Sequence, residues 1–84
     1  MTELDISGNL LKDEIEELKS LTFLKKLNLA NNMITEMYNL PTNLEILNIS
    51  YNQMKRLNSD VISQLKNLKT LDISNNGLES LEGL

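Results

Sequence analysis

Few side chains in this chain could take part in a reaction, and most of them are carboxylates. The 84 residues include no histidine and no cysteine, which removes the commonest general base, the commonest metal ligand and the thiol nucleophile. A serine nucleophile needs a base within hydrogen-bond reach, and the sequence offers no candidate. The glycines Gly8, Gly77 and Gly83 are isolated, so they form no phosphate-binding loop. We therefore expect no catalytic residue and no cofactor, and the chain is predicted not to be an enzyme.

Four of the twelve acidic residues form one acidic run, made of Asp13, Glu14, Glu16 and Glu17. The run lacks the spacing of a calcium-binding loop, so we interpret it as the solvated face of a helix and expect no metal site. Twelve acidic residues against eight basic ones give a net charge of −4. Because phosphate binding requires clustered lysine and arginine, this balance argues against nucleic acid as a partner.

Asparagine offers another chemistry, because its side-chain amide both donates and accepts hydrogen bonds. One asparagine stands at the ninth position of each of four similar segments, MTELDISGNLL, LKKLNLANNMI, LEILNISYNQM and LKTLDISNNGL. The segments begin at residues 1, 24, 44 and 68, so successive copies are 23, 20 and 24 residues apart. In each copy, apolar residues occupy the first, fourth, sixth and eleventh positions. Neither a helical period nor a strand period alone produces this spacing.

The template L-x-x-L-x-L-x-x-N-x-L, repeated about every 20–29 residues, is the signature of a leucine-rich repeat. The chain is identified as a member of that family, and with its GLESLEGL ending it loosely resembles the intracellular SDS22-like members. The resemblance implies an α/β solenoid, a curved right-handed coil. Short parallel strands then line its concave face, and helical or extended return segments its convex face. Residues 1–84 would form a single domain of four repeats and a partial fifth, as a fragment of a longer solenoid.

The resemblance also implies a role for the repeated asparagines. In this family the asparagine side chain lies inside the coil and bonds to the turn backbone of its own and the adjacent repeat. An unpaired buried backbone group costs about 1–3 kcal/mol, so such bonds are structural in effect. We therefore expect a structural ladder made of Asn9, Asn32, Asn52 and Asn76.

The alternation of side chains along each expected strand sets which residues face inward. We predict strands over residues 3–7, 26–30, 46–50 and 70–74. Their inward pairs are Leu4 and Ile6, Leu27 and Leu29, Leu47 and Ile49, and Leu71 and Ile73.

The return segments are predicted to differ. Asp13 and Glu16 form a plausible capping box for a helical turn in KDEIEELKSLTF, with Ile15, Leu18 and Leu21 inward. NSDVISQLKN is expected to form a second helical turn, capped by Asn58 or Ser59, that buries Val61 or Ile62 with Leu65. TEMYNLPTN is too short for a helix, and Pro41 disfavours one at Leu40. We expect an extended segment there, with Met37 and Leu40 inward.

The outward strand positions form the surface on which we expect a partner to bind. Tyr51 and Ile46 are aromatic or apolar where the repeat gives no packing reason for them, which is the usual form of an interaction hot spot. Lys26 lies in the same row as Ile46. A second row contains Asn28, Asn48 and Asp72, which could bond a partner's arginine or lysine or serve only as solvated surface that holds strand register.

These features favour a non-catalytic scaffold that binds another protein, of unknown identity, through the concave face. A second class stays open, because NLPTNLEILNISYNQM resembles the 20-residue repeats of bacterial effector ubiquitin ligases. The chain would then be the substrate-recognition segment of a larger enzyme. A receptor-like module for sugars or microbial ligands is the third and least favoured class, because cysteine-rich caps and a secretion signal are missing.

The sequence also leads to expectations about membrane binding, cellular location and self-association. No apolar run approaches the roughly 18 residues that a membrane span requires, so we expect no membrane partner. The lack of cysteine favours an intracellular location, in the cytoplasm, in the nucleus or on the cytoskeleton. Neither end carries a polar cap, which favours a fragment of a longer solenoid, and self-association through the open repeat edges is the alternative.

Overall fold

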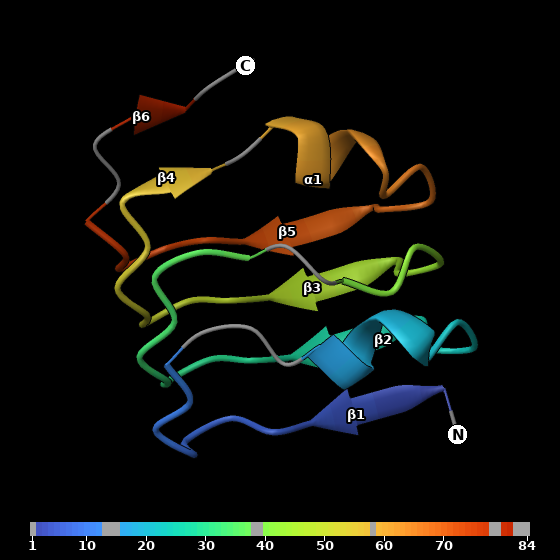
Figure 1. Cartoon of the computed structure of the whole chain (residues 1–84), viewed down its shortest axis with the longest axis horizontal. Helices are drawn as coiled ribbons and strands as arrows, with labels where there is room; N and C mark the ends of the chain where they lie inside the picture. Colours follow the sequence, from blue (N-terminus) through green and yellow to red (C-terminus); the bar gives the residue numbers. More distant parts are fainter. Residues whose placement is uncertain (1, 13–15, 38–39, 58, 78–79, 82–84) are drawn as a thin grey trace.

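The fold is a parallel sheet with one short strand from each repeat. The computed structural model describes residues 2–12, 16–37, 40–57, 59–77 and 80–81, with the backbone alone for residues 16, 56, 57, 59, 80 and 81. The sheet has the order β1 (Glu3–Asp5), β2 (Lys26–Asn28), β3 (Ile46–Asn48) and β5 (Thr70–Asp72), as Figure 1 shows. Its register places the inward leucines in one row, Leu4, Leu27, Leu47 and Leu71. This arrangement confirms the predicted leucine-rich repeat solenoid.

The strands begin where the sequence predicts and end two residues earlier. The prediction that they run to Ser7, Ala30, Ser50 and Ser74 was wrong for a local reason. At the last residue of each strand, a side-chain oxygen accepts a hydrogen bond from the backbone N–H two residues on. The Asp5 Oδ1 atom lies 2.9 Å from the nitrogen of Ser7, and the other three strands repeat the bond at 3.0 Å. An aspartate or asparagine bonded in this way starts a turn and competes with strand geometry.

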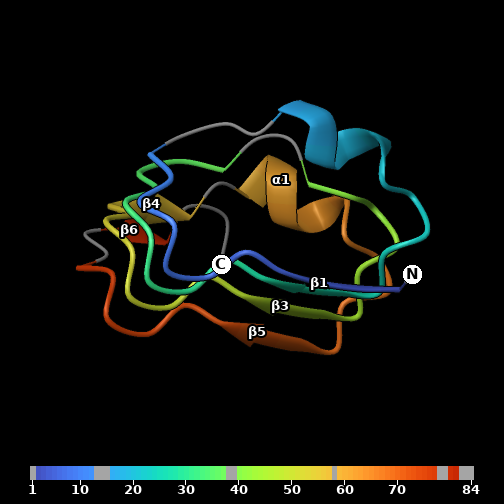
Figure 2. The same ribbon diagram turned by 90° about the horizontal axis from the view of Figure 1, so that it is seen from below.

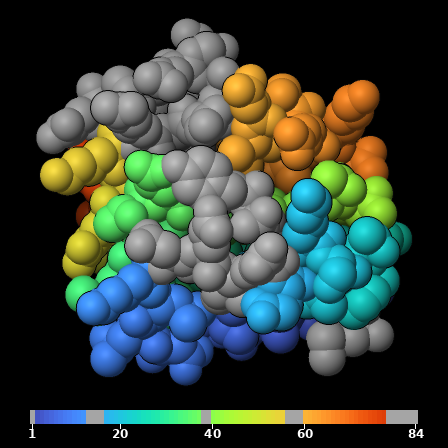
Figure 3. Space-filling view, in the orientation of Figure 1, coloured from blue at the N-terminus to red at the C-terminus, as the bar shows by residue number. Residues whose placement is uncertain are grey.

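A second layer covers the inner face of the sheet, and Figure 2 shows both layers edge-on. It contains the 3₁₀ helix η1 (Glu16–Ser20) and the helix α1 (Ser59–Ser63), which match the two predicted helical turns. Leu18 and Leu65 are buried between the layers. Residues of η1 (light blue) and the region of α1 (orange) lie on the convex face in Figure 3. The Asp13–Glu16 box, Ile15 and the cap at Asn58 or Ser59 lie outside the described residues or side chains.

The segment between β2 and β3 contains no helix among its described residues, as its length and Pro41 predict. Leu40 and Pro41 are buried and Met37 is partly buried. A second, two-stranded sheet was not predicted, and in it β4 (Arg56–Leu57) pairs in parallel with β6 (Ser80–Leu81). Two-residue strands are too short to show an alternation of apolar and polar residues, so no periodic pattern predicts them.

The core is deepest in the two middle repeats. Leu27, Leu29, Leu47 and Ile49 are almost completely buried, because a neighbouring repeat covers each of them on both sides. Their counterparts in the outer repeats, Leu4, Ile6, Leu71 and Ile73, are only partly buried. The stacking of repeats, rather than any single repeat, therefore creates the core. Within the described part of the chain, no helix is long and apolar enough to cross a membrane.

Replacing Leu47 with alanine is expected to lower the free energy of unfolding by about 2–5 kcal/mol, because the cavity would be closed on all sides. Leu4→Ala at the matching position of the first repeat should cost clearly less, since Leu4 already has solvent on one side. Urea unfolding followed by circular dichroism measures both losses. Equal losses would contradict the difference in packing between middle and outer repeats.

Candidate functional site

Asparagine side chains connect successive repeats inside the coil. The Asn52 side chain donates to the carbonyl oxygens of Ile49 and Ser50 in its own turn, at 3.0 and 3.1 Å. It also donates to the carbonyl of Leu29 at 2.9 Å and accepts from the N–H of Ile34 at 3.0 Å, both in the preceding repeat. One amide therefore holds two turns together.

Asn32 and Asn76 repeat this arrangement, and all three residues are about 7% exposed. Asn9 differs, because its side chain is exposed and donates only to the carbonyls of Ile6 and Ser7 in its own turn. Among the described residues, no buried side-chain nitrogen or oxygen lacks a partner. The ladder is therefore a structural network in which the three buried amides have their bonds satisfied within the fold.

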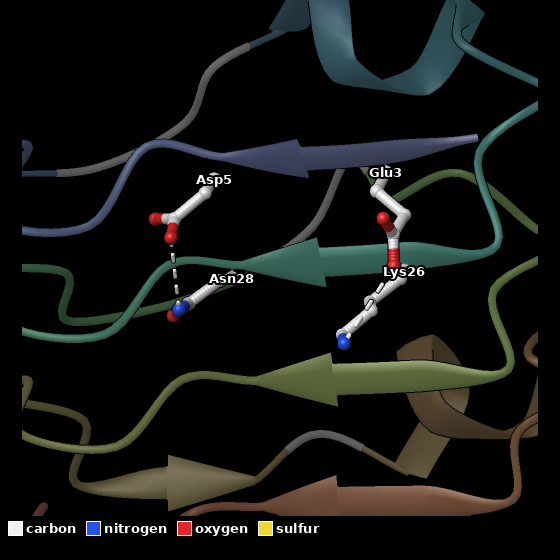
Figure 4. Close-up of polar contacts among 4 residues, drawn as sticks. All are labelled: Glu3, Asp5, Lys26 and Asn28. Carbon is white, nitrogen blue, oxygen red and sulfur yellow. Dashed lines mark hydrogen bonds and ion pairs between the residues drawn. The ribbon is translucent and has the colours of Figure 1, made fainter. Parts of the chain in front are cut away.

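A second row of side chains runs across the outer face of the sheet, formed by Asp5, Asn28, Asn48 and Asp72. Each uses its Oδ1 atom in the turn that ends its strand. Figure 4 shows the one link between repeats in this row, from the Asn28 amide nitrogen to Asp5 Oδ2 at 3.4 Å. The row thus holds the turns from outside, and the Asp72 turn bonds use only the Oδ1 atom of its carboxylate.

Hydrogen bonding to the charged form lowers the pKa of both aspartates in this row. For Asp72, the hydroxyl of Ser74 lowers the pKa most, at an Oγ–Oδ1 distance of 2.7 Å, and the Ser74 N–H adds to the effect. For Asp5, the Ser7 hydroxyl and N–H lower the pKa in the same way, and the Asn28 amide contributes less. Both carboxylates are therefore charged at neutral pH and give the face a negative character.

Lys26 and Ile46 lie side by side at the beginning of the strands. The Lys26 ammonium is 3.6 Å from the Glu3 carboxylate, in an exposed pair that is weak in water (Figure 4). Ile46 is 37% exposed and stands between Lys26 and Thr70 in the register. The sequence analysis did not foresee the ion pair, since it depends on the alignment of β1 with β2.

Tyr51 lies three residues beyond the end of β3, so the structure places it at the opposite end of that strand from Ile46. Its side chain is 56% exposed. Its backbone φ of 54° is in the left-handed region, where bulky residues are rare. Asn31 and Asn75 precede the ladder asparagine in the neighbouring repeats and share this conformation, with φ of 57° and 56°.

A shallow hollow of about 420 Å³ lies just past the strands, around the row that contains Asn31, Tyr51 and Asn75. It is lined by Asn31, Asn32, Tyr51, Asn52, Gln53 and Asn75. The signal for Asn31 and Asn75 was present, because they occupy the same repeat position as Tyr51. No group of three histidine, cysteine, aspartate or glutamate side chains in the described ranges could hold a metal ion. This arrangement can bind a ligand through three kinds of group, which are its side-chain amides, one aromatic ring and a few charges.

Comparison with known proteins fits this geometry. A family described as "Leucine Rich repeats (2 copies)" matches residues 1–41 and again residues 42–84. The chain belongs to the leucine-rich repeat family. Its relatives include mimecan from Homo sapiens and from Bos taurus, each 33% identical over 84 residues that cover 96% of this chain. The leucine-rich repeat serine/threonine-protein kinase 1 of Caenorhabditis elegans is 36% identical over 86 residues. This leucine-rich repeat chain spans 28% of the length of these mimecans and 4% of the kinase.

The ladder predicts a clear difference between two asparagines. Asn52→Ala should lower the free energy of unfolding by on the order of 1–3 kcal/mol, because backbone groups of two repeats lose their partner in a buried place. Asn9→Ala should cost less, since Asn9 is exposed and bonds only its own turn. Thermal unfolding of both variants is the measurement, and an unchanged melting temperature for Asn52→Ala would count against the ladder.

The bonds around Asp72 predict a loss of stability in acid. Its folded-state pKa lies below the unfolded value, so this contribution is complete above the unfolded pKa and disappears as pH falls through the folded pKa. Asp72→Asn should leave the melting temperature at neutral pH nearly unchanged, because Asn48 makes the same turn bond to Ser50. The melting temperature should then fall less between about pH 5 and pH 2 than in the parent chain.

The matched control is Asp72→Ala, which removes the turn bond at every pH and should lower the melting temperature at neutral pH as well. Parallel acid profiles for the parent chain and Asp72→Asn would show that the carboxylate makes no pH-dependent contribution.

Proposed function

We propose that this chain is a non-catalytic module that binds another protein through the concave face of its sheet. Leucine-rich repeats generally mediate interactions between proteins, and the family match covers both halves of the chain. One observation identifies the residues that we expect to contact the partner. The third repeat exposes two large apolar side chains, Ile46 on its strand and Tyr51 just beyond it. No described segment covers the outer side of the sheet in Figure 2.

Polar neighbours of these two residues support the same proposal. Ile46 is flanked by Lys26 and Thr70, and Asn48 lies between Ile46 and Tyr51 along the repeat. An apolar centre with a polar rim is the usual layout of an interaction hot spot. Four strands about 4.8 Å apart make a face only about 14 Å wide, so this chain supplies part of a standard interface.

The partner's chemistry follows from the charges on this face. Lys26 is already paired with Glu3, whereas Asp5 and Asp72 carry lowered pKa values and no cationic partner among the described residues. A protein surface with lysine or arginine fits such a face better than nucleic acid does. We further propose an intracellular setting, which the absence of cysteine supports.

A second candidate function is recognition of a substrate on behalf of a larger enzyme. The observation that favours it is the match to the worm protein, whose name combines leucine-rich repeats with a serine/threonine kinase. Both candidates use the same binding face and differ in what the complete gene encodes. Sequencing the full transcript separates them, because only the second requires a catalytic domain in the same chain.

Photo-crosslinking tests the choice of face. A benzoylphenylalanine residue at position 70, beside Ile46 on the concave face, should form a discrete adduct in an extract of the source cells. The same group at position 66, on an exposed loop after α1, is the matched control and should give none. Adducts formed only from position 66 would place the binding surface at the loop after α1 instead of on the sheet.

With the crosslinked partner purified, Ile46→Thr should weaken binding by about 1 kcal/mol or more, which is at least roughly fivefold in Kd. Threonine keeps the β-branched shape that suits a strand, and Thr70 already occupies this position in the next repeat. The melting temperature should therefore stay close to that of the parent chain. Titration calorimetry of Ile46→Thr against Lys66→Ala gives the comparison, and an unchanged Kd for Ile46→Thr would remove this residue from the interface.

A further inference from the structure

Tyr51 occupies a backbone position that suits other residue types. In the four repeats, the residue before the ladder asparagine is Gly8, Asn31, Tyr51 or Asn75, and all four have φ between 54° and 67°. Glycine and asparagine enter this left-handed region readily, whereas a bulky residue does so at a cost. Three of the four repeats thus carry the residue type that the turn favours, and Tyr51 is the exception.

Among the described residues, neither packing nor backbone bonding accounts for the tyrosine. Its side chain is 56% exposed. Its N–H donates to the Ser74 carbonyl at 3.0 Å, and the N–H of Asn31 makes the equivalent bond to Ser50 at the same distance. Asparagine therefore gives this turn the same bond without the strain. Because the strained backbone of Tyr51 is not offset by a stabilising contact, it points to a role for the side chain.

The surroundings of Tyr51 are uncharged and rich in amides. Five of the six residues that line its hollow are asparagine or glutamine, and none is charged, in a chain whose residues are 24% charged. Asn32 and Asn52 already use their amides in the ladder. Three further side-chain amides line the hollow and form no hydrogen bond with other described residues. They belong to Asn31, Gln53 and Asn75, and all three residues are exposed. The hollow therefore fits an uncharged ligand with hydrogen-bonding groups.

The spacing of these groups selects among such ligands. The backbone bonds of Asn31 and Tyr51 continue the strand ladder past the sheet, so adjacent repeats stay about 4.8 Å apart here. Asn31 and Asn75 then lie about 9.6 Å apart, on either side of Tyr51. A polyproline II helix rises about 3.1 Å per residue with three residues per turn, so groups on one side recur about every 9.3 Å. In a fully extended peptide they recur about every 6.7 Å, which does not match.

Proline also supplies the complementary chemistry. It has no N–H, so the backbone of a proline segment offers carbonyl acceptors and no donors, which suits the NH₂ groups of asparagine. The polyproline II helix has no internal hydrogen bonds, and its rings pack on aromatic side chains in known recognition sites.

We propose that the hollow at Tyr51 binds an uncharged, proline-rich segment of a partner protein in the polyproline II conformation. A proline ring of the segment packs on the Tyr51 ring. Carbonyls three residues apart accept hydrogen bonds from the side chains of Asn31 and Asn75. The inference rests on the proposed function, because it takes the partner to be a protein. It adds which segment of that protein binds at the Tyr51 end of the face.

The test is an NMR titration of the ¹⁵N-labelled full chain with a nonaproline peptide blocked at both ends. The side-chain NH₂ signals of Asn31 and Asn75 should shift and saturate, while those of Asn43, at the opposite end of the strands, should not. Tyr51→Asn should weaken binding at least about tenfold, as loss of a hot-spot ring does. Its melting temperature should equal or exceed that of the parent chain, because asparagine tolerates the left-handed backbone. Weak binding combined with undiminished stability separates a lost contact from a lost fold.

Two variants serve as matched controls. Tyr51→Phe keeps the ring and should retain most of the affinity. Phe23→Asn removes the other exposed aromatic ring of the described chain, which lies before β2 and outside the hollow, and should leave affinity unchanged.

Two further ligands complete the test. A blocked glycine–serine peptide of equal length should bind far more weakly, because it lacks both the rings and the preformed helix. Shifts with maltohexaose and none with nonaproline would overturn the proposal in favour of a sugar ligand. Unchanged affinity in Tyr51→Asn, or no shifts at millimolar peptide, would also overturn it. Since Ile46 and position 70 lie outside the hollow, none of these failures affects the crosslinking test of the concave face.

Discussion

The hydrogen bonding of a buried amide is the interaction on which the rest of this molecule depends. Each repeat must reverse its chain inside a tightly packed coil, and the turn leaves backbone groups that cannot reach water. Asn32, Asn52 and Asn76 satisfy those groups in two repeats at once. The asparagine of the following repeat completes the hydrogen bonds of a turn, so a repeat does not reach its final conformation by itself. The strand register and the rows of surface side chains follow from this sharing.

The same turns are also held from outside, and this second restraint shapes the exposed face of the sheet. Asp5, Asn28, Asn48 and Asp72 end their strands by accepting a backbone N–H, so the side chains of that row are partly committed to structure. The side chains that neither restraint uses are those just before each ladder asparagine and those at the start of each strand. Tyr51 and Ile46 occupy such places, which is why they stand out from a surface otherwise dictated by the repeat.

Much of the fold could be predicted because it is periodic, and what was missed depends on side-chain bonds or register. Burial of Leu27 and Leu47 follows from the repeat template, and the helical turns around Leu18 and Leu65 follow from apolar spacing. The early strand ends were missed because alternation says nothing about a carboxylate or carboxamide that bonds the backbone two residues on. The pair between Lys26 and Glu3 needed the alignment of two strands. The left-handed backbone of Tyr51 was readable by comparing repeats, but the template treats that position as unrestricted.

The uneven burial of the repeats implies that local stability is graded along the coil. Leu4 and Leu71 have solvent on one side, whereas Leu47 and Ile49 do not, so the outer repeats should fray while the inner ones stay closed. Amide protons of β1 and β5 would then exchange with solvent well before those of β3. Tyr51 and Ile46 both belong to the third repeat, one of the two protected ones. A ligand that binds there meets a surface already ordered and loses little affinity to the entropy of arranging it.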